Sequence, residues 1–181
     1  AGFTVRLSDS LPPLIVEKTF LLNVQPALPG RNDSIATATP LSGGGYHGLS
    51  LSGPGDTSDT DYYQLTADGG SIVVVVTAAA ALNPPSPTDT IIEILRDDGT
   101  RFTTCTNPGL DDGVTGAPDL TPFDFDDPCL NDDIELGAAT DSQLSFEVPG
   151  TGVVTFYLHV LDYYGASRPD LLYDLSISGA H

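Results

Sequence analysis

The sequence predicts an all-β fold, an antiparallel, jelly-roll-like β-sandwich with an N-terminal strand or hairpin extension. Short segments alternate between apolar and polar residues, turn-forming residues separate them, and the 181 residues include 19 Gly and 15 Pro. Such a composition disfavours long helices, whereas short strands joined by frequent turns are typical of sandwiches and barrels. Residues 34–38 form the one helical turn that the sequence indicates.

Nine strands are expected from the period-two alternation of apolar residues. They cover residues 3–7, 14–24, 48–51, 61–66, 71–78, 90–96, 143–148, 152–162 and 171–178. Residues 72–76 are continuously apolar and β-branched, which predicts a central strand buried on both faces. In the strand 152–162 one set of alternate residues is expected to face the core: Val154, Phe156, Leu158 and Val160. The other set is expected to face solvent or a partner: Thr155, Tyr157, His159 and Leu161.

The chain divides into three parts. Residues 1–24 form an N-terminal strand segment, residues 25–30 form a linker that contains two prolines, and residues 31–181 form the sandwich domain. Two strands alone cannot bury a core. We therefore expect residues 1–24 to belong to a neighbouring domain of a longer protein or to pair with another subunit. The sequence starts without Met or a signal peptide, and we expect it to be a mature or excised piece.

The charge of the chain restricts its partners. Six Lys and Arg stand against 25 Asp and Glu, which gives a formal net charge of −19. Nucleic-acid binding requires the opposite sign, and anionic membrane surfaces are disfavoured for the same reason. No apolar run approaches the ~20 residues of a membrane span. The acidic excess favours either divalent-cation binding or a solvated surface that keeps the protein soluble, and both interpretations stay open here.

The two cysteines predict a disulfide. Cys105 and Cys129 lie in Pro- and Asp-rich segments, outside any CxxC pair and away from histidine, which disfavours a zinc site. A bond between them closes a loop of a length worth about 3 kcal/mol in the chain-entropy model. Disulfides persist in oxidising compartments, so we expect an extracellular location, secreted or at the cell surface.

Carboxylates gather in short groups that suit a calcium ion. Calcium takes six to eight oxygen ligands, which loops rich in Asp and Asn can supply. No group has the spacing of an EF-hand loop, and solvated loop carboxylates are the alternative reading. The groups are Asn32 and Asp33; Asp56, Asp59 and Asp61; Asp124, Asp126 and Asp127; and Asn131, Asp132 and Asp133.

Residues suited to catalysis are few, and we expect the chain not to be an enzyme. GxSxG, HExxH and SxxK motifs are absent from the sequence, and its three histidines are isolated. Tyrosine suits binding surfaces because it offers rigid contact area with a polar group. A possible ligand face consists of Tyr157, His159, Tyr163 and Tyr164. The alternative is that these side chains form the core and rim of the sandwich.

Six ordered segments lie within residues 30–179: RNDSIATATPL, DTDYYQLTADGGSIVVVV, TDTIIEILRDDGT, LNDDIE, SQLSFEVPGTGVVTFYLHV and LLYDLSISG. In their order and spacing they resemble the bacterial pre-peptidase C-terminal (PPC) domain, whose relatives include the collagen-binding domains of secreted collagenases. Residues 1–24 resemble the last two strands of a bacterial immunoglobulin-like domain.

The resemblance implies a non-catalytic sandwich that accompanies secreted proteins and binds Ca²⁺. Its calcium ligands correspond here to Asn32, Asp33, Asp59 and Asp61, and its acidic loop corresponds to Asn131, Asp132 and Asp133. The chain departs from the family in two places. It has Leu-Pro-Gly-Arg at residues 28–31 where the family often has Glu, which leaves one expected ligand without a counterpart. The segment between the two cysteines is longer than expected, and its acidic residues could form a separate calcium site or a binding loop.

The expected function is therefore that of an extracellular calcium-binding module that serves adhesion or binding. Two alternatives remain. One is a structural subunit of an extracellular filament, assembled by self-association when residues 1–24 donate a β-strand to another subunit. The other is a carbohydrate- or collagen-binding module, with a polysaccharide or an extracellular-matrix protein as its ligand.

Overall fold

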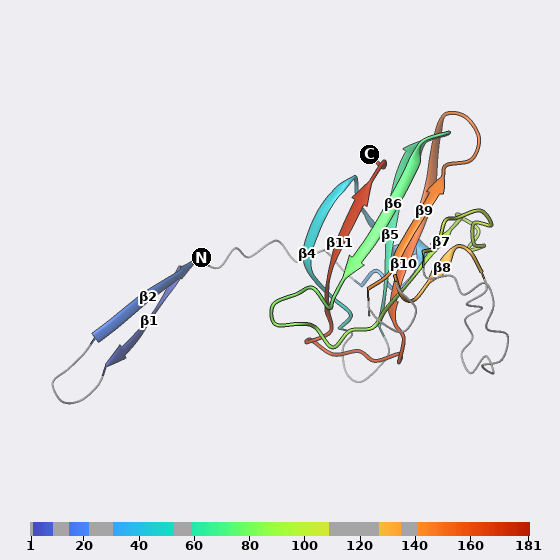
Figure 1. Ribbon diagram of the computed structural model, residues 1–181. Helices are drawn as coiled ribbons and strands as arrows, with labels where there is room; N and C mark the ends of the chain where they lie inside the picture. Colours follow the sequence, from blue (N-terminus) through green and yellow to red (C-terminus); the bar gives the residue numbers. More distant parts are fainter. Residues whose placement is uncertain (1, 9–14, 22–30, 53–58, 109–126, 135–140) are drawn as a thin grey trace.

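The protein is a two-layered β-sandwich preceded by a separate β-hairpin (Figure 1). The computed structural model describes residues 31–52, 59–108, 127–134 and 141–181, together with the backbone of residues 2–8 and 15–21. No helix in these ranges is both long and apolar enough to cross a membrane. The predicted fold class is confirmed.

Two sheets form the sandwich, and their strands follow a jelly-roll winding. The five-stranded sheet has the order β3-β5-β10-β7-β8 and the four-stranded sheet has the order β4-β11-β6-β9. If β4 to β11 are counted from one to eight, the sheets have the orders 2-7-4-5 and 1-8-3-6, as in a jelly roll. The strands are β3 (Thr39–Pro40), β4 (Gly44–Ser50), β5 (Thr60–Asp68), β6 (Ile72–Ala78), β7 (Thr90–Leu95), β8 (Leu130–Asn131), β9 (Gln143–Glu147), β10 (Val153–Asp162) and β11 (Leu172–Ser178).

The first two strands form a hairpin of their own. β1 (Gly2–Ser8) pairs antiparallel with β2 (Ile15–Leu21) in a register that runs from Gly2 opposite Leu21 to Ser8 opposite Ile15. Within the described residues these strands form a two-stranded sheet that no third strand joins. Residues 9–14 and 22–30, which include the expected turn and linker, lie outside the described residues.

Alternating strand residues from both sheets fill the core between the layers. Phe156, Leu158 and Val160 of β10 are buried there, and Val154 packs against them as expected. Tyr63 and Tyr173 are among the largest fully buried side chains and come from opposite sheets. Phe146 and Phe156 meet edge to face with ring centroids 5.1 Å apart, which joins the two layers at a second point.

The apolar run at residues 72–76 is a central strand, but the expectation that both its faces are buried is wrong. β6 lies between β11 and β9, and its alternate residues Val73, Val75 and Thr77 are buried, whereas Ile72 is 57% exposed. Every residue is buried in β7, and also in the two-residue strand β8. An apolar run shows that its side chains favour burial. Whether the outer face of the strand is in fact buried depends on which loops cover that sheet.

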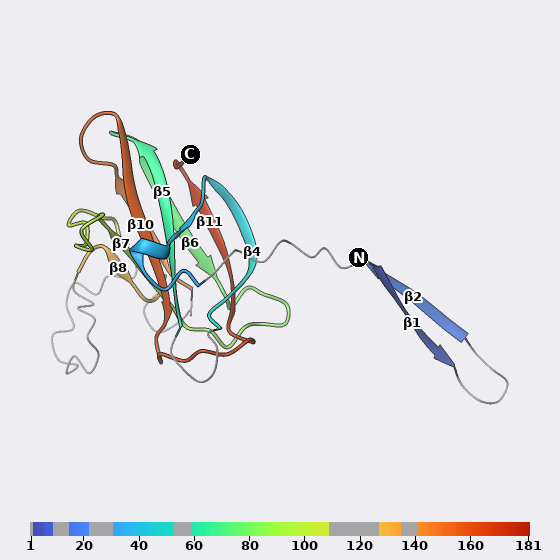
Figure 2. The ribbon, with the colours of Figure 1, turned by 180° about the vertical axis from the view of Figure 1, so that it is seen from behind.

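The sequence predicts that Tyr157, His159 and Leu161 face solvent or a partner, and the structure shows that they do not face solvent. All three are buried on the outer face of the five-stranded sheet. On this face the Tyr62 ring stacks on the His159 imidazole, and Figure 2 shows the short 3₁₀ turn at residues 35–37 in front of the sheet. There Leu161 packs with Ile91, Leu130 and Tyr163 in a small second cluster. Only Thr155 of the outward set is exposed.

Sequence reasoning missed three short pieces of strand. β3, β8 and the first residues of β4 did not show a clear alternation. β3 pairs parallel with β5, the one parallel pair among the described strands. The expected helical turn is present as a 3₁₀ helix, η1 (Ile35–Thr37), which contacts β5.

Candidate functional site

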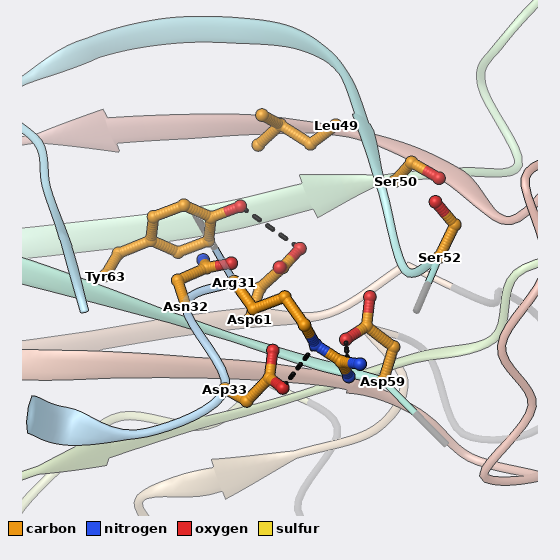
Figure 3. A pocket seen from close by; sticks show the side chains of 9 residues that line it. All are labelled: Arg31, Asn32, Asp33, Leu49, Ser50, Ser52, Asp59, Asp61 and Tyr63. Atoms are coloured by element: carbon orange, nitrogen blue, oxygen red, sulfur yellow. Dashed lines mark hydrogen bonds and ion pairs between the residues drawn. The ribbon is translucent and has the colours of Figure 1, made fainter. Parts of the chain in front are cut away.

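An acidic pocket lies where the segment before η1 crosses the start of β5 and the end of β4 (Figure 3). It encloses about 170 Å³. Seven of its lining residues have side-chain oxygen atoms: Asn32, Asp33, Ser50, Ser52, Asp59, Asp61 and Tyr63. The four residues that the family resemblance assigned to calcium are thus brought together, although 26 positions of sequence separate Asp33 from Asp59.

Backbone pairing brings the two halves of this pocket together. The Tyr62 amide donates a hydrogen bond to the Asn32 carbonyl at 2.7 Å, and the Asn32 side-chain amide donates to the Tyr62 carbonyl at 3.2 Å. These two bonds hold the segment that starts at Arg31 along β5. Because successive side chains of a strand point to opposite sides, Asp59 and Asp61 share one side. This is the side of β5 that the segment borders.

Asp61 is the buried centre of the pocket. Its Oδ2 accepts hydrogen bonds from the hydroxyls of Tyr173 at 2.5 Å and Tyr63 at 3.2 Å, and the two hydroxyl oxygens lie 2.7 Å apart. Burial, with the nearby charge of Asp59, raises the pKa of Asp61 to about 6, although the tyrosine hydrogen bonds act in the other direction. A buried carboxylate that lacks a positive charge of its own favours an added cation.

Arg31 supplies the positive charge that the pocket contains. Its Nε lies 2.5 Å from Oδ2 of Asp33, and one terminal nitrogen donates to Oδ1 of Asp59 at 3.0 Å. Figure 3 shows the guanidinium group between these two carboxylates. Burial still raises the pKa of Asp59 above its usual value, because the opposing charge of Arg31 compensates only in part.

The chemistry of these side chains fits a hard cation. Carboxylate, amide and hydroxyl oxygens are the ligands that calcium uses. The hydroxyl oxygen of Ser50, at the wall of the pocket, is buried and has no hydrogen-bond partner among the described residues. Buried polar atoms are normally paired, so this atom indicates a missing ligand or water. Within the described ranges, however, no three His, Cys, Asp or Glu side chains are already arranged to hold a metal ion.

The acidic loop at residues 131–133 lies elsewhere, after β8. Asn131 uses its side chain structurally: its amide donates to Oδ1 of Asn107 and to the Asp133 carbonyl, and its oxygen accepts the Gln143 amide. Asp132 has a buried oxygen, Oδ1, without a hydrogen-bond partner in the described part of the chain. Burial and the charges of Asp89 and Asp133 raise its pKa to about 7.

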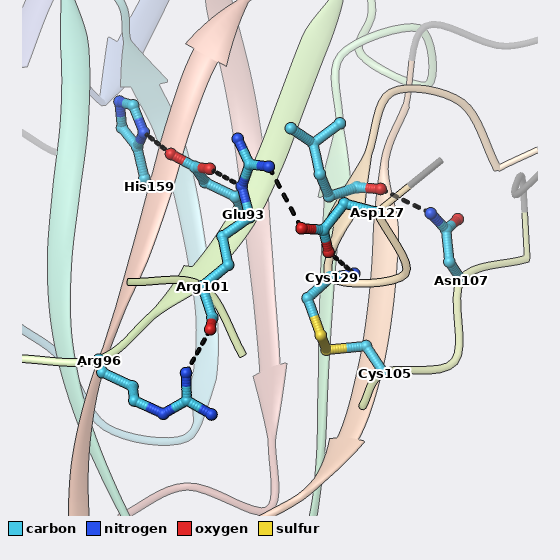
Figure 4. A network of polar contacts seen from close by, with 9 residues as sticks. Glu93, Arg96, Arg101, Cys105, Asn107, Asp127, Cys129 and His159 are labelled. Atoms are coloured by element: carbon cyan, nitrogen blue, oxygen red, sulfur yellow. Dashed lines mark hydrogen bonds and ion pairs between the residues drawn. A yellow bond between two sulfur atoms is a disulfide. The ribbon is translucent and has the colours of Figure 1, made fainter. Parts of the chain in front are cut away.

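The predicted disulfide joins Cys105 to Cys129, with their Cα atoms 5.0 Å apart. Cys129 is buried in the main core, and its amide donates to Oδ1 of Asp127 at 2.9 Å. Asp127 in turn accepts a hydrogen bond from Arg101 at 3.3 Å (Figure 4). Of the other acidic residues expected near calcium, Asp56, Asp124 and Asp126 lie outside the described residues.

His159 belongs to a buried charge network and does not form an exposed face. Its Nδ1 lies 2.6 Å from Oε1 of Glu93, Arg101 donates to Oε2 of Glu93, and the Tyr62 ring stacks on the imidazole with centroids 4.0 Å apart. Burial alone raises the pKa of Glu93, but the hydrogen bonds and charges of His159 and Arg101 outweigh it and lower the pKa.

The possible ligand face is therefore reduced to one edge. Tyr157 is buried, and its hydroxyl accepts a hydrogen bond from Gln64. Tyr164 is 76% exposed, and its ring contacts that of Tyr163 edge to face. Of the four residues proposed for this face, only Tyr164 presents a largely exposed ring.

Comparisons with known proteins do not assign this chain to a family. No family model matches the chain, and no curated protein matches it. Among solved structures, the chain is similar to PliG of Aeromonas hydrophila, a periplasmic inhibitor of g-type lysozyme, at 14% identity and a TM-score of 0.36. The match covers 80% of this chain and 96% of that one. A likeness at this level carries no argument about the function of this chain.

Sequence reasoning missed the residues that complete the acidic pocket. Arg31 was noted only as a departure from the family pattern, although its position beside Asn32 and Asp33 was a visible signal. Ser50 lies in a segment where no pattern set it apart. Tyr173 is 112 positions from Asp61, and only the tertiary fold brings its hydroxyl to that carboxylate.

Proposed function

We propose that this chain is a non-catalytic, calcium-binding module of a secreted or surface protein, which serves adhesion or binding outside the cell. The observation that carries the proposal is the acidic pocket, where Asn32, Asp33, Asp59 and Asp61 meet around one cavity beside the unpaired hydroxyl of Ser50. The disulfide supports an oxidising compartment.

Calcium would be held by oxygen atoms of these five residues. The bound ion would supply two positive charges that offset the carboxylates of Asp33, Asp59 and Asp61 and cross-link the segment before η1 to β5. Asp61 is positioned for this by its two tyrosine hydroxyls, which fix the direction of its carboxylate. The module would then gain stability in calcium-rich surroundings such as the extracellular space.

Calcium should raise the melting temperature of the full chain. A ligand that binds only the folded state at one hundred times its Kd adds about 2.7 kcal/mol, which corresponds to roughly 5–10 °C for a protein of this size. We expect this rise between chelator and saturating calcium, with a smaller response to magnesium, whose rigid octahedral coordination fits irregular loops poorly. Differential scanning calorimetry and calorimetric titration measure both quantities.

Two matched variants test the location of the site. Asp59→Asn removes a pocket carboxylate and should greatly reduce the calcium response, whereas Asp97→Asn makes the same change on an exposed turn and should leave the response intact. Equal melting temperatures of the unmodified chain in calcium and in chelator would count against the proposal.

Filament assembly through the N-terminal segment is a second candidate. β1 and β2 pair only with each other among the described strands, and a two-stranded hairpin is marginal in water by itself. The outer edge of β4 joins no other described strand, so the hairpin of a second copy could extend the four-stranded sheet there.

Strand addition predicts oligomers that disappear when residues 1–24 are deleted. Light scattering coupled to size-exclusion chromatography should show them for the full chain at high concentration and a monomer for the truncated one. A full chain that stays monomeric at millimolar concentration would remove this candidate.

A further inference from the structure

Arg31 places a cationic side chain on two of the oxygen donors that calcium would use. The guanidinium group is within 2.5 Å of Asp33 and 3.0 Å of Asp59, while Asp61 keeps its tyrosine partners. Arg31 and Asp33 are 41% and 38% exposed, but Asp59 is only 8% exposed. The arginine therefore reaches from solvent onto a nearly buried carboxylate.

Basic residues are scarce in the sandwich, which makes this contact unusual. Of the six basic residues, Arg6 and Lys18 lie in the N-terminal segment, which leaves four arginines and no lysine for residues 31–181. The other three arginines are engaged away from the pocket: Arg101 with Glu93 and Asp127, Arg168 with Asp170, and Arg96 over the Phe102 ring. Among the residues that line the pocket, Arg31 is the cationic one.

We propose that Arg31 is a built-in competitor of calcium, which sets the calcium concentration at which the pocket fills. This inference rests on the proposed function. A calcium ion and the guanidinium group use the same oxygens of Asp33 and Asp59 and repel each other, so the ion binds only when the arginine leaves. Because the Arg31 side chain is 41% exposed, it can move into water without burying an unpaired charge.

Competition predicts that the removal of Arg31 has opposite effects on stability and on calcium affinity. Without calcium, Arg31 partly neutralises the carboxylates of Asp33 and Asp59, so its removal lowers stability. With calcium, the arginine is a competing cation, so its removal increases affinity. A residue that only stabilises the folded pocket would lower both stability and affinity, and a residue that ligates calcium cannot be an arginine, since guanidinium has no acceptor atoms.

Arg31→Gln is the direct test. We expect the calcium Kd, measured by calorimetric titration, to fall about tenfold, in keeping with the loss of two partly exposed ion pairs and one repulsive charge. The melting temperature in chelator should fall at the same time. Arg31→Lys keeps the charge and should keep a Kd near that of the unmodified chain. Arg168→Gln, the same change at an exposed ion pair outside the pocket lining, should alter neither quantity.

A second measurement uses the unmodified full chain and needs no variant to fold. The NMR signal of the Arg31 Nε–H group, whose nitrogen lies 2.5 Å from Oδ2 of Asp33, should shift or disappear as calcium saturates the protein, while the Arg168 signal stays unchanged. If the Arg31 signal is unaffected at saturation, or if Arg31→Gln binds calcium with an unchanged Kd, the inference is overturned and the calcium-binding proposal stands. If neither chain binds calcium, both fail.

Discussion

Two partly buried carboxylates, Glu93 and Asp132, show opposite ways in which this acidic chain handles its charge. Glu93 lies on β7 between His159 and Arg101, and their hydrogen bonds and charges lower its pKa. Asp132 follows β8 and faces Asp89 and Asp133, and burial with those like charges raises its pKa to about 7. The first carboxylate stays ionised, whereas the second holds its proton up to neutral pH.

The difference between the two carboxylates depends on where the few basic residues lie. Arg101 bridges Glu93 on β7 and Asp127 beside the disulfide, so one cation serves two carboxylates. At Asp89, burial and the negative charges of Asp133 and Asp162 raise the pKa to about 6. The acidic pocket is intermediate, because the positive charge of Arg31 offsets only part of the rise in the pKa of Asp59.

Removing the positive charge of Arg101 from the Glu93 network should have the largest effect on the free energy of unfolding. Arg101→Gln leaves Glu93 and Asp127 without their shared guanidinium group, and breaking a buried ion pair typically costs 3–5 kcal/mol. Because the Arg101 side chain is 24% exposed, we expect a loss of about 2 kcal/mol, below that range. Urea unfolding in chelator measures it.

The matched control is Arg168→Gln. The Arg168–Asp170 pair is more than half exposed on both sides, so its loss should change the free energy of unfolding by less than about 0.5 kcal/mol. Equal effects of the two substitutions would mean that the Glu93 network contributes no more than a surface ion pair.

The sequence predicted the strands much better than it predicted their surroundings. Alternation identified β5, β9, β10 and β11 to within about two residues, because core-facing positions recur with period two. It could not show that Tyr157 and His159, whose side chains alternate with those of the core, would also be buried. The burial of His159 depends on contacts with Tyr62 and Glu93, which lie on other strands.

The candidate site was predictable to a similar degree. The four residues that correspond to calcium ligands in the resemblance, Asn32, Asp33, Asp59 and Asp61, line one pocket in the structure. The role of Arg31 could not be read from sequence, because an arginine beside acidic residues is equally common on a solvated surface. Calcium binding by these residues, and any role of Asn131, Asp132 and Asp133 in it, stays a prediction.

The two carboxylates act on stability in different pH windows. Glu93 has a lowered folded pKa, so its contribution is present above the unfolded value of about 4.3 and is lost as the pH falls through the lower folded value. Asp132 and Asp89 have raised folded pKa values of about 7 and about 6. The folded state therefore binds protons more tightly there, and this stabilisation is lost as the pH rises from about 4 to about 7.

Asp132→Asn should remove the contribution of Asp132 to the pH dependence of stability and leave that of Glu93 unchanged. In chelator at pH 7.5 we expect the variant to be more stable than the unmodified chain by about 1 kcal/mol, a value reduced for the partial solvent screening of this group. Its stability should fall less between pH 5 and 7.5, while the decline below pH 4 that comes from Glu93 should persist. Urea unfolding across this pH range, with Asp97→Asn as the matched exposed control, measures both. If the variant were instead less stable at pH 7.5 and lost part of its calcium response, Asp132 would be a cation ligand, and its unpaired oxygen would be part of a second calcium site.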